Sequence, residues 1–309
     1  MRQQEELDLP DLEVAGVDLH VHSTCSDGRI PPGDVVEAAA AAKLAVLALT
    51  DHDTVAGHAE AGTAARAAGI EFVGGIELST HDESMGGTHL LGYHVDGSSL
   101  ELTAYLAEAR DGRRDRARAI VGRLNGLGVG VTVDDVFAHV SEAGLVARPH
   151  VARALLDGGW VRSYREAFER FIAAGRPAYV PAGRITPAEG IALIRGAGGI
   201  AVLAHPGDAW SDGAIRDLTD AGLDGIEVLH PEHGRETVRR LRRLAASCAL
   251  LETGGSDWHG PGGGRARRLG AQPVPYDWHV RLAEAAGVRA GGNGGDAGPR
   301  AAPTGTEER

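Results

Sequence analysis

The stretch VDLHVHST, residues 17–24, alternates polar and apolar side chains, and this is the period of a β-strand. Its apolar residues would face one way, whereas Asp18, His20 and His22 would share the opposite face. Two imidazoles at positions i and i+2 of a strand can bind one metal ion, and Asp27 in the following loop adds a carboxylate. A single His-x-His pair is more often only a polar strand face, so the rest of the chain has to decide.

Several other apolar segments predict strands that end in the same kind of chemistry. The predicted strands are residues 44–49, 70–76, 89–94, 199–204, 225–229 and 249–253. The side chains at or just beyond their ends, or on the strand itself, are His52, Glu77, His89, His205, His230, Asp257 and His259. In a barrel of parallel strands the C-terminal ends open on one face, where catalytic residues collect. We therefore expect these residues to meet.

Helical segments between the strands predict an α/β fold. Residues 31–43 begin with two prolines and continue with an alanine-rich run, and residues 55–68 follow the next strand. Residues 98–177 interrupt this rhythm with a stretch that is rich in Arg, Glu, Ala and Leu at helical spacing, so we expect a mostly helical insertion. The predicted organisation is a solvated leader (1–15), a first barrel part (16–97), the insertion (98–177), a second barrel part (178–286) and a disordered tail (287–309).

Composition and charge limit the classes of function that the chain can have. The chain has 309 residues, is 43% hydrophobic and carries a net charge of -12, which argues against bulk coating of nucleic acid. A small anionic substrate stays possible because bound cations change the local field. The two cysteines, Cys25 and Cys248, form no C-x-x-C motif and predict a reducing, cytoplasmic environment. No apolar run approaches membrane-spanning length, so we expect no membrane partner.

Histidines and carboxylates together suit divalent ions of the Zn²⁺, Mn²⁺ or Fe²⁺ type. A closed structural zinc site is not expected, because no cysteine accompanies them. The candidate donors outnumber the needs of one ion, which predicts two or three ions with Glu77 as a bridge. The candidate donors are His20, His22, Asp27, His52, Glu77, His89, His150, His205, Asp257 and His259.

Four separated motifs resemble the PHP (polymerase and histidinol phosphatase) family. They are Asp18–Ser23, Thr50–Asp53, Gly75–Glu77 and Gly255–His259, and the resemblance covers about residues 16–280. It implies a distorted (β/α)7 TIM-like barrel with a trinuclear metal centre.

The resemblance also implies how the ligands are divided. One ion would be held by His20, His22, Glu77 and Asp257; a second by Glu77, His89 and His150; a third by Asp27, His52 and His259. Some relatives have a histidine at the Asp27 position, and the oxygen ligand here favours Mn²⁺ or Mg²⁺ over Zn²⁺.

Within the family, the segment HLLG at residues 89–92, the insertion and the segment RPH at residues 148–150 look most like the branch acting on nucleoside 3′,5′-bisphosphates. Members of that branch also trim short RNA from its 5′ end. The resemblance therefore implies a metal-dependent phosphoric ester hydrolase, a phosphatase and exoribonuclease, that cuts the 3′-phosphoester of a nucleotide held by its 5′-phosphate. Short single-stranded 5′-phosphorylated RNA would be a second substrate, and no obligate protein partner is expected.

Catalytic and substrate roles follow from side-chain chemistry. Asp27 and His205 are the predicted catalytic residues; His205 could protonate the leaving oxygen or bind phosphate. Arg148 is predicted to clamp the 5′-phosphate, because a guanidinium binds phosphate through two hydrogen bonds. His230 is a further candidate for substrate contact. Trp258 could stack on a base or only pack its loop.

The arginines of the insertion admit two interpretations. Residues 110–118 contain Arg110, Arg113, Arg114, Arg116 and Arg118, interleaved with acidic and apolar residues. They could attract an RNA backbone, but the interleaving favours a solvated helix face.

Two other functions stay open at this point. One is a phosphatase for another small phosphate such as histidinol phosphate. The other is a metal-stabilised domain without catalysis that binds nucleotides or a partner; the complete ligand set argues against it.

Overall fold

Seven strands form one mixed sheet in the part of the chain that the structure describes. The computed structural model describes residues 16–141, 144–181, 185–262 and 268–293. The strands follow one another across the sheet in the order in which they occur in the chain. They are β1 (Gly16–Asp18), β2 (Leu44–Leu49), β3 (Glu71–Asp82), β4 (Gly86–Tyr93), β5 (Ile200–Leu203), β6 (Gly225–Leu229) and β7 (Leu251–Gly254).

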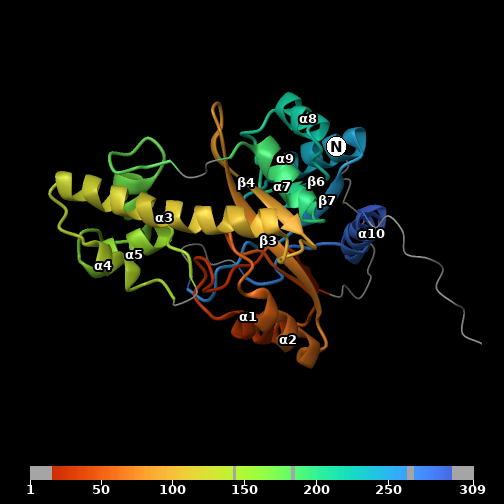
Figure 1. Ribbon diagram of the computed structural model, residues 1–309, viewed down its shortest axis with the longest axis horizontal. Helices are drawn as coiled ribbons and strands as arrows, with labels where there is room; N and C mark the ends of the chain where they lie inside the picture. The colour runs from red at the N-terminus through yellow and green to blue at the C-terminus, as the bar shows by residue number, and fades with distance from the viewer. Residues whose placement is uncertain (1–15, 142–143, 182–184, 263–267, 294–309) are drawn as a thin grey trace, which may run out of the picture.

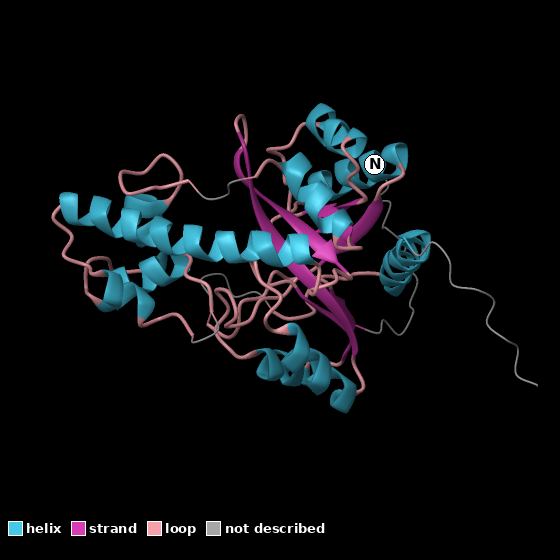
Figure 2. Ribbon diagram, in the orientation of Figure 1, coloured by secondary structure: helices cyan, strands magenta, loops and turns pink. Residues whose placement is uncertain are grey.

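Helices cover this sheet and extend away from it (Figures 1 and 2). The helices beside the sheet are α1 (Pro32–Ala41), α2 (His58–Ala68), α7 (Pro187–Gly196), α8 (Asp212–Asp220), α9 (Arg235–Cys248) and α10 (Tyr276–Asn293). The inserted helices are α3 (Leu100–Gly126), α4 (Val133–Phe137), α5 (Arg148–Asp157), α6 (Tyr164–Ala167) and the π-helical turn η1 (Phe168–Ile172). The fold is therefore mixed α/β, as predicted.

Strand β4 corrects the prediction of an all-parallel sheet. It pairs antiparallel with both β3 and β5, whereas the other neighbouring strands pair in parallel. The physical reason is the length of the β3–β4 connection, since residues 83–85 can form a hairpin but not a crossover. Glu77 consequently lies within β3 and not at its end, and His89 enters the common edge from the first half of β4.

The first strand is shorter than its alternation predicts. Only Gly16–Asp18 pair with β2 as a strand. Beyond this point the chain turns towards the other end of the sheet: the Leu19 amide donates to the carbonyl of Gly254 at 3.2 Å, and the His22 amide donates to that of Trp258 at 2.9 Å. The sheet is not closed by strand pairing, but these bonds join its two outer edges.

The insertion has a hydrophobic core of its own. The first turns of α3 pack with the main core through Leu102, whereas its later residues, from Ala117 onward, pack with α4, α5 and η1. In Figure 1 this long helix runs from the sheet into a lobe on the left. One helix thus connects the sheet to the insertion rigidly.

The C-terminal helix corrects the predicted start of the tail. Helix α10 continues to Asn293, because Trp278, Leu282 and Ala286 bury one helical face against the main core. The expected leader and the rest of the expected tail lie outside the described residues. No helix among the described residues combines the length and the apolar character needed to cross a lipid bilayer.

Candidate metal centre

One buried carboxylate, that of Glu77, lies at the centre of a ring of imidazoles. Its Oε2 is 3.1–3.2 Å from one nitrogen each of His20, His22 and His52. Its Oε1 is 2.8 Å from His89 Nδ1 and 2.9 Å from His205 Nε2. A carboxylate offers about four acceptor positions, so five surrounding nitrogens are more than it can bind as hydrogen-bond donors.

Two further carboxylates complete the ring. Asp257 Oδ1 lies 3.1 Å from His22 Nε2, and Asp27 Oδ1 lies 3.2 Å from His259 Nε2. Three sets of these side chains bring their donor atoms within 4.8 Å of one another. The sets are His20, His22, Glu77 and Asp257; His22, Asp27, His52 and His259; and His52, Glu77 and His89.

The donor atoms fit divalent ions. Both ring nitrogens of His22 and Nδ1 of His52 are buried yet make no hydrogen bond. Buried polar atoms rarely stay without a partner, since each such atom costs about 1–3 kcal/mol. His22 Nε2 and His52 Nδ1 lie 3.1 and 3.2 Å from Glu77 Oε2, a separation that suits two ligands of one ion. The described residues that could hold ions are therefore nitrogen and oxygen donors, which suits Mn²⁺, Fe²⁺ or Zn²⁺.

Electrostatics support the same conclusion. Burial opposes ionisation of Glu77, yet His52, His89 and His20 hold the pKa of this carboxyl well below its usual value. Burial dominates at His52 and lowers its pKa to about 3, so its ring is neutral and one ring nitrogen keeps a lone pair that can bind a cation. Burial also disfavours charged His20, but Glu227 and Glu77 raise its pKa to about 10. The carboxylates therefore require a positive charge among them.

Glu227 is a residue of this centre that the ligand list lacked. It is fully buried on β6, where Oε1 is 2.9 Å from His20 Nδ1 and Oε2 accepts the His205 backbone amide at 2.7 Å. A carboxylate behind a metal-binding imidazole orients the ring and makes it a stronger ligand. Its signal in the sequence was an acidic residue inside an apolar strand.

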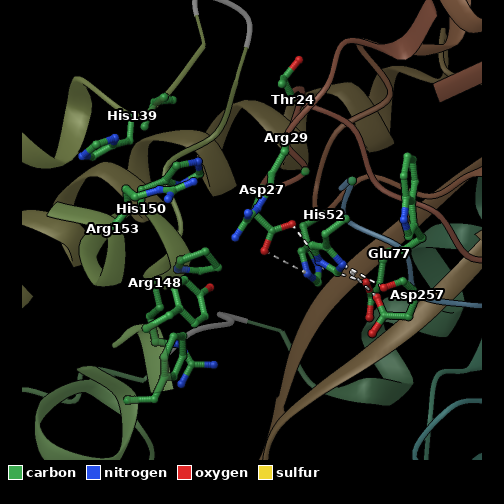
Figure 3. A pocket seen from close by; sticks show the side chains of 18 of the residues that line it. Thr24, Asp27, Arg29, His52, Glu77, His139, Arg148, His150, Arg153 and Asp257 are labelled. Atoms are coloured by element: carbon green, nitrogen blue, oxygen red, sulfur yellow. Dashed lines mark hydrogen bonds and ion pairs between the residues drawn. The ribbon is translucent and has the colours of Figure 1, made fainter. Parts of the chain in front are cut away.

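The structure separates His150 from the ion to which it was assigned. His150 belongs to α5 in the insertion, and Figure 3 shows it across the cavity from Glu77. Its Nδ1 accepts the Ala147 amide at 2.9 Å, so the neutral ring carries its proton on Nε2. His205, predicted as a catalytic or phosphate-binding group, lies beside Glu77 and also 3.3 Å from His89 Nδ1. The short path from β5 brings His205 to the position beside Glu77 and His89 that the family resemblance implied for His150.

A cavity of about 1340 Å³ lies between this centre and the insertion. Figure 3 shows Asp27, His52 and Glu77 on one side and Arg148 and His150 on the other. The lining residues that come from the insertion include His139, Ser141, Arg148, His150, Arg153, Tyr164 and Phe168. The two walls differ in chemistry: carboxylates and imidazoles face a wall rich in arginine.

Arg148 begins α5 and is held against aromatic rings. Its guanidinium lies 5.9 Å from the Phe168 ring centroid and 5.7 Å from that of Tyr179. Burial lowers the pKa of Arg148. No carboxylate among the described residues forms an ion pair with its guanidinium. It can therefore offer its charge to an anion in the cavity.

The remaining candidates are placed less favourably for substrate contact. His230 lies at the cavity but is buried, with Nε2 3.4 Å from Asp257 Oδ2. Trp258 touches the cavity yet packs with Val21 and Leu47 in the core under α1 and α2. Packing explains Trp258 better than base stacking does, since only 8% of the residue is exposed.

Comparison with known proteins agrees with this geometry. A model of the PHP domain matches residues 18–112. The chain is 37% identical over 260 residues to a 3′,5′-nucleoside bisphosphate phosphatase of Chromobacterium violaceum, covering 82% of this chain and 90% of that protein. It is 37% identical over 251 residues to a 5′-3′ exoribonuclease of Haemophilus influenzae, covering 80% and 90%.

A solved structure is also similar. A metal-dependent phosphoesterase from Bifidobacterium adolescentis superposes with a TM-score of 0.82 at 35% identity, over 87% of this chain and 96% of that one. The similarity to both relatives and to this structure covers at least 80% of the chain. The chain therefore belongs to the PHP family.

Proposed function

We propose that this protein is a metal-dependent phosphoesterase that hydrolyses the 3′-phosphoester of nucleoside 3′,5′-bisphosphates and removes 5′-nucleotides from short 5′-phosphorylated RNA. The observation that carries the proposal is the cavity of about 1340 Å³ with two unlike walls. One wall gathers the donor sets for ions, and the other presents arginine and imidazole. A nucleotide with two phosphates offers an anion to each wall. One relative is named for nucleoside bisphosphates and the other as an exoribonuclease that acts from the 5′ end.

The metal wall supplies the reaction chemistry in this proposal. His20, His22, Asp27, His52, Glu77, His89, Asp257 and His259 would hold the ions, with His205 added beside Glu77 and His89. Bound divalent ions supply a nucleophilic hydroxide near neutral pH and neutralise phosphoryl charge. Mn²⁺ is the ion we propose first, because the donors combine imidazole nitrogen with several carboxylate oxygens.

The chain's own residues prepare this chemistry. Glu227 fixes the ring of His20 and the backbone of His205, so two histidines keep their orientation whatever the substrate does. Asp27 lies at the edge of the centre nearest the insertion in Figure 3, where a reacting phosphoester would enter. The conformational entropy of ordering these groups is therefore lost during folding and not during the reaction.

The insertion wall would hold the other end of the substrate. Arg148 would bind the 5′-phosphate through its planar fork, and the Nε2 proton of His150 would donate to the same anion. Both residues come from the first turn of α5, whose N-terminus also favours negative charge.

Two finer assignments belong to the same proposal. The hydrogen bonds from Leu19 to Gly254 and from His22 to Trp258 support a distorted (β/α)7 barrel whose outer strands meet at the metal centre. The two cysteines are free thiols, which supports a reducing, cytoplasmic compartment.

The deciding experiment measures phosphate release with Mn²⁺ from adenosine 3′,5′-bisphosphate, 5′-AMP, 3′-AMP and histidinol phosphate in parallel. We expect preference for the bisphosphate, with 5′-AMP as the product, because only this substrate engages both walls. A 5′-phosphorylated trinucleotide should release the same kind of monophosphate, and its 5′-hydroxyl counterpart should react far more slowly.

Each contrary result has a definite meaning. Preference for histidinol phosphate, or equal rates on all four compounds, would overturn the substrate while leaving the metal centre. An absence of hydrolysis from every substrate, with ions demonstrably bound, would overturn the enzymatic function itself.

A further inference from the structure

Arg113 does not lie on the solvated helix face that the sequence predicts for it. It lies in the middle of α3, and its side chain is only 11% exposed. Its Nε and Nη2 donate to Asp53 Oδ2 at 2.8 and 2.5 Å, and Nη2 also donates to Ser79 Oγ at 3.0 Å. Arg118 on the same helix instead pairs with Asp115 at the surface, which is the arrangement that the sequence favoured for both.

Asp53 stabilises the backbone turn that contains His52. Its Oδ1 accepts the Ser79 amide at 2.7 Å, and its own amide donates to the Glu77 carbonyl at 3.0 Å. His52 and Glu77 pair directly as a parallel bridge. Asp53 also has a backbone φ of 50°, a left-handed conformation that costs energy for a residue with a side chain. The bonds from its carboxylate keep the chain in this turn.

His52 has a special place in the centre. It belongs to the set with His22, Asp27 and His259 and to the set with Glu77 and His89, but not to the set that contains His20. A small rotation of the turn at Asp53 would therefore disturb two of the three donor sets.

We propose that Arg113 is a positioning residue that acts through Asp53 to fix His52 for metal binding, so that the insertion helix and the metal centre form one mechanical unit. The inference rests on the metal centre of the proposed function. Arg113 does not line the cavity among the described residues, so it acts through Asp53 and not by touching the substrate. Because the core of the insertion begins on the same helix at Ala117, the link also sets where the arginine-rich wall stands.

The test counts ions in purified full-length variants. Wild type, Arg113→Gln, Arg113→Lys and Arg116→Gln are stripped with a chelator and titrated with Mn²⁺, and free Mn²⁺ is followed by electron paramagnetic resonance. Arg116 is the matched control, since it is a part-buried arginine of the same helix whose hydrogen bond goes to the Val180 carbonyl, so it acts on Asp53 only through longer-range charge. Circular dichroism melting of the stripped proteins reports folding separately.

We expect Arg113→Gln to bind its weakest ions at least tenfold less tightly, or to bind fewer of them, while the ion of the set containing His20 is retained. Arg113→Lys keeps the charge but not the fork, so its affinity should fall between those of wild type and Arg113→Gln. Arg116→Gln should bind ions like wild type, whatever its melting temperature.

Other results would overturn the inference. Wild-type stoichiometry with affinities within threefold in Arg113→Gln, or an equal loss in Arg116→Gln, would make Arg113 only a structural anchor. If Arg113→Gln does not fold, the comparison of Arg113→Lys with Arg116→Gln decides on the same criteria. Failure of the wild-type protein to bind Mn²⁺ would instead contradict the proposed function.

Discussion

The two walls of the cavity are built by different means. The metal wall takes its side chains from segments scattered along the chain and buries them behind Glu227 and Asp53. The insertion wall takes its groups from consecutive short helices around a separate core, and Arg148 there is held by aromatic rings. Ions need donors fixed to within fractions of an ångström, and burial with supporting hydrogen bonds fixes them here. In the proposed function, the reaction and the selection of its substrate therefore lie on separate parts of the molecule.

The largest effect should follow from removing the centre of the metal wall. Glu77→Gln keeps the shape of the side chain but removes the charge that five imidazoles surround. We expect kcat on adenosine 3′,5′-bisphosphate to fall at least about a thousandfold and ion binding to weaken, since the ions contribute several kcal/mol to the transition state. Steady-state kinetics and ion counting measure both effects.

The matched control for this variant is Asp115→Asn, which removes an exposed acid on α3. It should leave both quantities as in wild type. A Glu77→Gln enzyme with full activity would contradict the assignment of separate roles to the two walls, because the ion-binding wall would then not perform the chemistry.

A smaller effect is expected from the insertion wall. Arg148→Ala removes the candidate phosphate contact and should raise KM for the bisphosphate by about tenfold or more, the value of a charged hydrogen bond. We expect kcat to change less, because the reacting phosphoester lies at the other wall. Steady-state kinetics on adenosine 3′,5′-bisphosphate and 3′-AMP separate these quantities.

The second substrate sharpens this prediction. Since 3′-AMP has no 5′-phosphate, the substitution should hardly alter its hydrolysis. An equal loss on both compounds would show that Arg148 serves folding or chemistry and not recognition of the 5′-phosphate.

The smallest effect concerns the scaffold beneath the metal wall. His58 Nε2 donates to the Gly75 carbonyl at 2.7 Å, and burial lowers the pKa of this imidazole. The unfolded chain therefore takes up the proton first, so this contribution to stability is complete above about pH 6.5 and is lost as the pH falls below it. His58→Gln keeps an N–H donor but does not titrate.

Thermal unfolding of the ion-free proteins at pH 7.5 and 5.5 measures the difference. Wild type should lose more stability on acidification than His58→Gln, by about 2–4 °C if the difference is near 1 kcal/mol. The other histidines titrate in both proteins and cancel in the comparison. Parallel curves for the two proteins would contradict the assignment.

Much of the metal wall followed from local pattern. Apolar runs of four to six residues predicted the buried strands β2, β5 and β6, and the polar residues after them meet at one edge. His20 and His22 lie with Glu77 because residues two apart on extended chain point the same way. These inferences needed only the period of a strand and the direction of its ends.

Long-range choices were not accessible in that way. His150 and His205 have the same side chain and similar settings, and only the path of α5 and β5 separates the cation wall from the metal wall. Arg113 and Arg118 are both helical arginines, yet one meets a buried carboxylate from a distant turn. Hairpin pairing likewise placed Glu77 inside a strand.

By itself the sequence determined the chemistry of this protein: the donor types, their attachment to strands and turns, and the presence of a helical insertion. Those features depend on side-chain identity and on periodicity, which are local properties. The tertiary structure alone decided which histidines surround Glu77, that Glu227 supports His20, and that Arg113 joins the insertion to His52 through Asp53. These are contacts between residues far apart in the chain, and they arise only when packing brings separate elements together.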